Sequence, residues 1–494
     1  MKRAVPSRAR WLTFIFVALL GLAVRLPQLG VRPMHTDEAV NGYIVGQLLA
    51  GEPFNYDPQD RHGPALSALA LPLARLQGAR SFSDLNESEL RLAPVLAGTI
   101  TILLFGAAVE MFGFLPCLTA ALLFAFGPLS VYYDRYFIHE SLFCAATLGL
   151  IVSGWRASKT HSVSDPVVAG ACAAVMLAAK ETAVIHFFAL AAALIALAFR
   201  NRAANGSRVW FRSRTLLIGI GTFLALSILL YTWFGRDWSA LPALLHAAPP
   251  HLLSRAAGQD HEKPFWYFAQ LLSSGWSGGI LIALAAIGLA VTIRRRDPAP
   301  YRYIAIYFIF ITAIYSLIPY KTPWLALNLW FPLALFAGRA IEFLWTRAVE
   351  HLPTRGAVPA LGILGAIIAV LIAHDTRQRV FLHPADEQNP YAYAHTTEDI
   401  LGLPLEISEM VRRDGIANPS VAVIASDPWP LPWYLRRFSQ VGFWQPGQQP
   451  GKADFYITST DLAEQYRDQL KDYRADFFGV RPGVLILLWL PVPK

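Results

Sequence analysis

Long apolar runs separated by short charged stretches make up most of the chain. About 20 apolar residues cross a bilayer as a helix, and hydrocarbon favours helices because the backbone must satisfy its own hydrogen bonds. The pattern therefore predicts an α-helical polytopic membrane protein with about 11 transmembrane helices. The predicted spans are 11–30, 91–112, 114–133, 141–158, 165–180, 182–199, 215–235, 276–293, 302–319, 324–345 and 356–373.

Two segments depart from this pattern. Residues 31–90 hold a predicted helix over 39–49, and an apolar stretch at 64–77 that is too short to span and is expected to lie along the membrane surface. The charged tail, 374–494, predicts a small α/β domain. Its strand-like runs are 421–425, 454–458 and 484–490, and its helical patterns are 400–413 and 459–472. We therefore divide the chain into a transmembrane domain, 1–373, and a C-terminal domain, 374–494.

Basic residues cluster in alternate loops, and such clusters mark the cytoplasmic side. Eleven spans place all the clusters on that side, so we expect a cytoplasmic N-terminus, with the 31–90 loop and the tail outside. The first run reads as a retained signal anchor of a cell inner or plasma membrane protein. The basic residues are Lys2, Arg3, Arg8, Arg10, Arg156, Lys159, Arg200, Arg202, Arg208, Arg212, Arg214, Arg294, Arg295, Arg296, Arg347 and Arg355.

Composition agrees with a membrane protein. Only 15% of the 494 residues are charged and 55% are hydrophobic, whereas soluble proteins carry about 25% charged residues. The net charge of +8 comes with arginines at the ends of apolar runs, so it indicates topology rather than nucleic-acid binding. Three cysteines within apolar runs fit neither a disulfide framework nor a zinc site.

Candidate catalytic residues lie in the predicted outer segments. Asp37 and Glu38 follow the first span, where a carboxylate can take a proton from an attacking hydroxyl. The alternative is that Thr36 or Asp37 only caps the next helix. His62 is a candidate for contact with a phosphate or a hydroxyl, or is a simple loop histidine.

Further candidates follow the later spans. Arg135 can pair with a phosphate or with a nearby acid such as Glu140. The adjacent Lys180 and Glu181 interrupt an apolar hairpin, as a site or as a topological signal. Lys321 can neutralise a leaving phosphate, or Tyr320 and Lys321 together anchor the chain at the interface. Cations and carboxylates on one membrane face suit a lipid-phosphate substrate whose tail stays in the bilayer.

These motifs resemble the GT-C superfamily of membrane glycosyltransferases over about residues 11–345. The likeness is to the family-39 branch (protein mannosyltransferase and aminoarabinose transferase-like), and within it to a prokaryotic flippase-activity-associated subfamily. The element Trp429–Arg436 resembles a family segment near a domain interface. The motifs are Asp37-Glu38, Tyr56-Asp57-Pro58, His62-Gly63-Pro64, Arg135 to Glu140, Lys180-Glu181 and Tyr320 to Trp324.

The resemblance implies an inverting glycosyltransferase that moves a sugar from a polyprenyl-phosphate donor to an acceptor hydroxyl at the outer face. It implies Asp37 as general base, with Glu38 beside it. Arg135 and Lys321 would hold the donor phosphate, and His62, Glu140, Lys180, Glu181 and Tyr320 would shape the site. Relatives often carry Asp where Glu140 stands. We expect no metal and no cofactor.

Two other functions stay open. A transporter or flippase of lipid-linked sugar usually shows repeats and polar residues at mid-membrane, whereas these spans are mostly apolar at their centres. A non-catalytic scaffold is the third reading. The sequence names neither the sugar nor the acceptor, which is a protein, a lipid or a glycan.

Overall fold

The computed structural model describes residues 7–203, 212–257, 261–351 and 354–492. Lys2, Arg3 and Arg208 of the predicted basic clusters lie outside them. The chain forms two compact units. The first, which we call the helical unit, contains 1–27, 53–69 and 91–382; the second, which we call the tail unit, contains 28–52, 70–90 and 383–494. The domain division at residue 373 stays a prediction.

A helix lies at each of the eleven predicted spans, which confirms the helical polytopic fold. Among the described residues, seven helices are long and apolar enough to cross a membrane, so the number of spans and the orientation stay predictions. The helices at the eleven predicted spans are α1 (Ser7–Arg25), α4 (Glu87–Ala107), α6 (Phe114–Phe126), α7 (Pro128–Tyr133), α8 (Glu140–Lys159), α9 (Ser164–Ala179), α10 (Ala183–Ala203), α11 (Ser213–Tyr231), α15 (Gly275–Arg294), α16 (Ala299–Leu317), α17 (Ala326–His351) and α18 (Thr354–Thr376).

One expected span, 114–133, is broken in the structure. Helix α6 ends at Phe126, and α7 begins at Pro128 after Gly127. Proline lacks the backbone N–H that would continue the helical ladder, but it suits the first position of a helix. The break releases carbonyls at the end of α6, and these carbonyls become important for the site described below.

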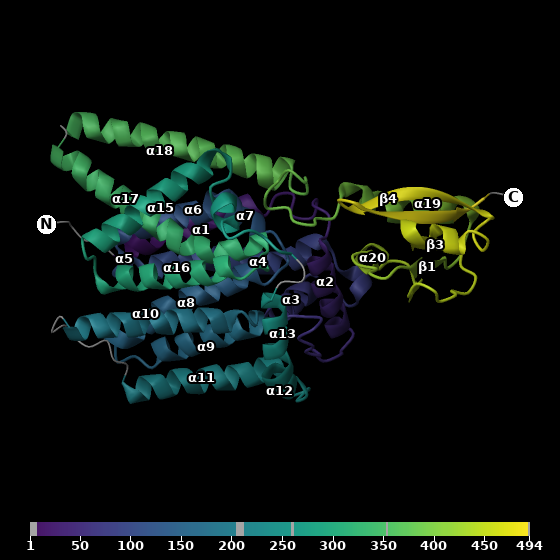
Figure 1. The fold of residues 1–494 in the computed structure, drawn as a ribbon, viewed down its shortest axis with the longest axis horizontal. Coiled ribbons are helices and arrows are strands. Elements are labelled where there is room, and N and C mark those ends of the chain that lie inside the picture. The colour runs from purple at the N-terminus through teal and green to yellow at the C-terminus, as the bar shows by residue number, and fades with distance from the viewer. Residues whose placement is uncertain (1–6, 204–211, 258–260, 352–353, 493–494) are drawn as a thin grey trace. The chain divides into compact units, whose positions relative to one another are not determined.

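The long helices of the helical unit pack closely, and α8, α9, α10 and α11 run roughly parallel in Figure 1. Contacts join α8 to α9, α9 to α11, α10 to α16, α15 to α17, and α6 to both α1 and α17. Small residues allow this approach. A Cβ on Gly288 would lie 1.8 Å from the carbonyl oxygen of Phe336, and one on Gly170 would lie 2.3 Å from that of Gly219.

Short elements fill the connections. The predicted helix over 39–49 is α2 (Thr36–Leu49), and the apolar stretch 64–77 forms α3 (Ala65–Leu76). The other short elements are η1 (Phe82–Asp84), α5 (Val109–Phe112), α12 (Ala240–Pro242), η2 (Ala243–Ala247), α13 (Ala248–Ala256), α14 (Tyr267–Leu272), η3 (Pro323–Leu325) and η4 (Arg377–Leu382).

The C-terminal residues form the predicted α/β domain around a five-stranded sheet of order β2-β1-β3-β5-β4. Strand β1 is parallel to β2 and β3, and β5 is antiparallel to β3 and β4. The strands are β1 (Ser420–Ile424), β2 (Gln440–Trp444), β3 (Phe455–Ser459), β4 (Tyr473–Arg481) and β5 (Val484–Pro491). The helices are η5 (Glu398–Leu401), α19 (Gly402–Asp414), α20 (Leu431–Tyr434), η6 (Thr460–Leu462) and α21 (Ala463–Tyr466).

The three predicted strands are β1, β3 and β5, and the sequence missed β2 and β4. Both missed strands lie at the edges of the sheet, where a strand needs fewer apolar residues. The helix predicted over 459–472 is wrong in length, because only η6 and α21 form there. Tyr466 and Leu470 from this region pack with Ile424 and Tyr456 in the core of the domain.

Candidate active site

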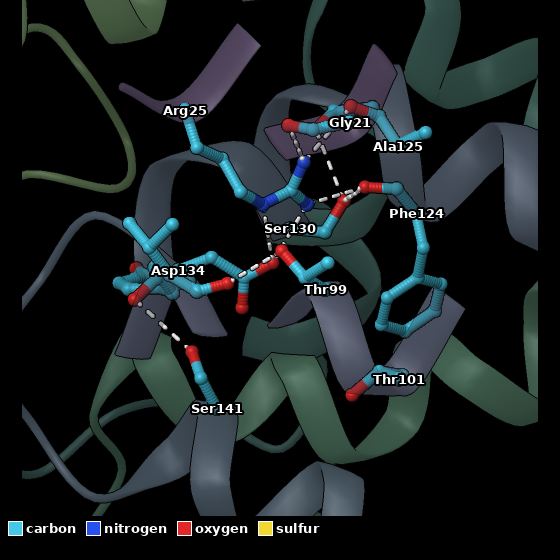
Figure 2. Close-up of polar contacts among 12 residues, drawn as sticks. Gly21, Arg25, Thr99, Thr101, Phe124, Ala125, Ser130, Asp134 and Ser141 are labelled. Atoms are coloured by element: carbon cyan, nitrogen blue, oxygen red, sulfur yellow. Dashed lines mark hydrogen bonds and ion pairs between the residues drawn. The ribbon is translucent and has the colours of Figure 1, made fainter. Parts of the chain in front are cut away.

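A buried ion pair stands beside the break between α6 and α7. Arg25, at the end of α1, donates to Asp134 Oδ2 from Nε at 3.0 Å and from Nη2 at 2.7 Å, and both side chains are inaccessible to solvent. The same guanidinium donates to the carbonyls of Phe124 and Ala125, which the break releases, and to that of Gly21 (Figure 2). Arg25 therefore satisfies both the carboxylate and the open end of α6.

Arg135 directly follows Asp134 in the chain, and the ion pair with a nearby acid that we considered from the sequence stays a prediction. Its Nη1 donates to the carbonyls of Arg25 and Pro27, both at 2.6 Å, and its guanidinium lies 4.8 Å from the ring of Phe381. Arg135 thus caps the C-terminal end of α1, where cations are favourable.

Glu181 is the centre of a polar cluster. Its Oε1 accepts a hydrogen bond from the hydroxyl of Tyr56 at 2.9 Å, and its Oε2 lies 2.8 Å from Nδ1 of His62. Burial by itself raises the pKa of the Glu181 carboxyl, but the charge and hydrogen bonds of His62 and the Tyr56 hydroxyl outweigh it and lower the pKa to about 2. This carboxylate is held ionised and oriented.

Gly63 sets how closely the His62 loop approaches the helices. A Cβ at this position would lie 2.4 Å from the carbonyl oxygen of Ala178 and 2.9 Å from the hydroxyl of Tyr231. Only glycine fits there without displacing the backbone. Gly63 therefore brings His62 against the end of α9, where Glu181 follows.

A second pair borders the cluster. Lys180 Nζ lies 2.5 Å from Glu140 Oε1, and the Glu140 carboxylate is buried. The ring of His139 meets that of His62 edge to face at 5.1 Å. Burial lowers the pKa of His139 well below its usual value, and the nearby charges of His62 and Lys180 lower it further, so His139 is neutral.

Lys321 is buried and is surrounded by carbonyls. Its Nζ donates to the carbonyls of Ile318 at 2.6 Å and Lys263 at 3.0 Å, and burial lowers its pKa. In the part of the chain that the structure describes, no carboxylate pairs with it. The adjacent Tyr320 forms a β-bridge with Glu262 and packs edge to face on the ring of His261.

The two acidic residues of the first loop, Asp37 and Glu38, belong to the tail unit. Helix α2 is capped by His35, not by Thr36 or Asp37, and Nδ1 of His35 accepts the N–H of Asp37 at 3.0 Å. Glu38 is fully buried, accepts the N–H of His35 at 3.1 Å and lies 3.5 Å from Arg32. The side chain of Asp37 is 48% exposed.

The structure thus joins His62 to Glu181 and Lys180 to Glu140, and it places Arg135 and Lys321 on separate carbonyl sets. The sequence reasoning missed Arg25, Tyr56 and His139 as site residues. An arginine within an apolar span is itself a functional signal that would have identified Arg25. In the described ranges, no three His, Cys, Asp or Glu residues are arranged to hold a metal ion.

Comparisons with known proteins agree with the resemblance. The family described as Dolichyl-phosphate-mannose-protein mannosyltransferase matches residues 76–233. No curated protein matches the sequence.

Three kinds of solved structure resemble the whole chain. ArnT from Cupriavidus metallidurans bound to undecaprenyl phosphate has a TM-score of 0.66 and 15% identity, covering 98% of this chain and 99% of that one. The oligosaccharyltransferase AglB from Archaeoglobus fulgidus, with an inhibitory peptide and a dolichol-phosphate, has a TM-score of 0.54 and 15% identity, covering 98% and 76%. The arabinofuranosyltransferase AftD from Mycobacteria has a TM-score of 0.52 and 13% identity, covering 99% and 40%. The predicted GT-C fold is confirmed.

Proposed function

We propose that this chain, which has the fold of the GT-C superfamily of membrane glycosyltransferases, transfers a sugar from a polyprenyl-phosphate donor to an acceptor hydroxyl at the outer face of the membrane. Two proteins of similar fold are described with undecaprenyl phosphate and dolichol-phosphate. The family match over 76–233 is to transferases named for a dolichyl-phosphate sugar.

Lys321 is the observation that carries the proposal. Burying an ammonium group is unfavourable unless an anion compensates it, and the described part of the chain offers Lys321 only carbonyl oxygens. A phosphate that arrives with the donor would supply the missing negative charge. The lowered pKa of Lys321 also follows from this uncompensated burial.

The chemistry we assign to the other residues follows from their surroundings. Asp37 acts as general base because its carboxylate is half exposed at the start of a helix. Glu38 supports it from beneath, since its carboxylate is buried against Arg32 and the N–H of His35. Arg135 favours the phosphate electrostatically, while His62, Glu140, Lys180, Glu181 and Tyr320 form the walls of the donor site.

The transition state we propose carries positive charge on the sugar ring and negative charge on the leaving phosphate. The acceptor oxygen attacks the anomeric carbon, the bond from that carbon to the phosphate oxygen breaks, and the acceptor proton passes to Asp37. The anomeric centre inverts in this single displacement. Lys321 and Arg135 stabilise the departing phosphate, which is the place where preorganised cations lower the barrier.

The test is sugar transfer by the purified protein in liposomes, from a panel of radiolabelled polyprenyl-phosphate sugars and with candidate acceptors. We expect Asp37→Asn to lower kcat by about 10² to 10⁴, the range of a general base. Lys321→Met should chiefly raise the donor KM. Asp60→Asn is the matched control, because Asp60 is exposed and pairs with its neighbour Arg61.

Equal transfer by the wild type and by folded Asp37→Asn would disprove the role of Asp37. If no donor is consumed and labelled lipid instead crosses the bilayer, the protein is a transporter and the transferase proposal fails.

A further inference from the structure

Hydrogen bonds join the turn that carries Asp37 to residues of the C-terminal segment. Residues 28–52 group with 383–494 in the tail unit. The backbone of Met34 is held on both of its polar groups: its N–H donates to the hydroxyl of Tyr434 at 2.8 Å, and its carbonyl accepts from Oγ1 of Thr396 at 2.7 Å. All three residues are buried, so water cannot replace these bonds.

His35 extends this attachment to Asp37 itself. Because Nδ1 of His35 accepts the N–H of Asp37, that nitrogen carries no proton, and the proton of the neutral ring is on Nε2. Nε2 then donates to the carbonyl of Tyr393 at 3.1 Å. One ring therefore connects the C-terminal segment to the amide of Asp37.

Helix α2 is fixed by the same segment further along. Gly42 lies flush against Trp433, since a Cβ on Gly42 would lie 2.8 Å from the indole ring. The indole N–H donates to Glu87 Oε1 at 2.7 Å, and Arg436 donates to the carbonyl of Leu85. The tail unit thus holds both the first turn and the face of α2.

We infer that Tyr434 and Thr396 are positioning residues for Asp37, so that the C-terminal domain forms part of the catalytic machinery rather than a separate binding module. This inference rests on the proposed function. Neither side chain contacts Asp37 directly; each acts through the backbone of Met34 and the His35 cap. Tyr434→Phe removes an acceptor of the Met34 N–H and a longer bond, at 3.4 Å, from the Tyr434 hydroxyl to the Met34 carbonyl, and Thr396→Val removes the shorter bond to that carbonyl. Either loss weakens the attachment of the turn that orients Asp37.

The chain offers matched controls for both substitutions. Tyr466 is a buried tyrosine of the same domain whose hydroxyl also accepts an N–H, from Gly447, and donates to a carbonyl, of Gln448. Thr397, next to Thr396, donates to the carbonyl of Gly479 at 2.6 Å. Tyr466→Phe and Thr397→Val therefore remove equivalent bonds that do not involve residues 28–52.

The experiment compares Tyr434→Phe with Tyr466→Phe, and Thr396→Val with Thr397→Val, in the full-length protein. We expect Tyr434→Phe and Thr396→Val to lower kcat by about tenfold to a hundredfold, the cost of misplacing a catalytic group by about 1 Å, with a donor KM within about twofold. The controls should keep kcat within about twofold of the wild type. Hydrogen exchange at the amides of Asp37, Glu38 and Ala39 should accelerate in the first member of each pair only.

Unchanged kcat in Tyr434→Phe and Thr396→Val despite faster exchange would overturn the positioning role. Equal exchange in all five proteins would overturn the attachment itself. A wild type that transfers no sugar would instead overturn the proposed function and with it any role of Tyr434 in transfer, while the exchange data would still decide whether the C-terminal segment holds the turn.

Discussion

The helical unit and the tail unit differ in the interactions that fix their candidate site residues. In the helical unit, acidic and basic side chains meet away from solvent: Arg25 pairs with Asp134, Lys180 pairs with Glu140, and Nδ1 of His62 lies 2.8 Å from Glu181. In the tail unit, the turn before Asp37 is held mainly by neutral hydrogen bonds from Tyr434, Thr396 and His35.

The difference shows where each kind of interaction is useful. A buried charge requires a partner at fixed geometry, so the pairs of the helical unit define its arrangement firmly. A half-exposed carboxylate such as Asp37 needs only its backbone fixed, which leaves its oxygens available for a proton. The tail unit also contains ion pairs away from solvent, Arg32 with Glu38 and Arg436 with Glu87, and Glu38 accepts the N–H of His35 in the Asp37 turn.

Breaking the most buried pair should have the largest effect. We expect Arg25→Ala to lower the free energy of unfolding by about 3–5 kcal/mol, because it removes the charged partner of the buried Asp134 carboxylate and one donor from each of the carbonyls of Phe124 and Ala125. Arg25→Lys should recover only part of this loss, since the lysine ammonium cannot replace the several N–H donors of the planar guanidinium group. Thermal unfolding in detergent measures both.

Arg61→Ala is the control for Arg25, because Arg61 pairs with the exposed Asp60 and such surface pairs contribute about 0–1 kcal/mol. Equal melting temperatures for Arg25→Ala and Arg61→Ala would refute the contrast between buried and exposed pairs.

The stabilisation that Glu181 contributes to the helical unit should depend on pH. The pKa of Glu181 is lowered to about 2, below the ordinary value of about 4.3. A depressed pKa stabilises the folded state fully above the ordinary pKa, and this stabilisation is lost as the pH falls toward the folded value. We expect Glu181→Gln to be less stable than the wild type by about 3 kcal/mol at pH 7.

That difference should shrink between about pH 5 and pH 2, because both proteins then carry a neutral group at position 181. Unfolding at a series of pH values measures it, with the exposed Glu52→Gln as control. A gap that stays constant over this range would show that the His62 and Tyr56 contacts do not depend on the charge of Glu181.

Sequence patterns predicted the helices well but not the partners of the charges. Long apolar runs leave little choice of secondary structure in a membrane, so every predicted span contains a helix. The adjacent Lys180 and Glu181 looked like one topological signal, yet Lys180 pairs with Glu140 and Glu181 with His62. Lys180 ends α9 in an extended conformation, and pairing at such a junction depends on tertiary packing.

Asp134 shows the same limitation. The sequence analysis assigned Asp134 no partner, and the structure pairs it with Arg25, 109 residues away. The partner was set by the Gly127-Pro128 break, because Arg25 can satisfy the released carbonyls and the carboxylate together. Sequence patterns also did not predict the hydrogen bonds from Met34 to Thr396 and Tyr434, which lie 362 and 400 residues away.

The smallest expected effect is at a partly exposed carboxyl of the tail unit, Glu406. Burial raises the pKa of Glu406, a hydrogen bond and the charge of Asp476 raise it further, and together they bring it to about 7 although Arg474 opposes them. A carboxyl with a raised pKa binds its proton more tightly in the folded state, so stability is highest below about pH 4 and is lost as the pH rises toward 7.

Glu406→Gln removes this penalty. The variant should therefore match the wild type near pH 4 and exceed its stability at pH 8, by less than about 1 kcal/mol because solvent screens the partly exposed group. Glu464→Gln, from an exposed pair with Arg467, should show no such pH dependence. If Glu406→Gln is instead less stable at pH 8, the attraction between Glu406 and Arg474 outweighs the repulsion between Glu406 and Asp476. Opposite-charge pairing would then stabilise the tail unit as it does the helical unit.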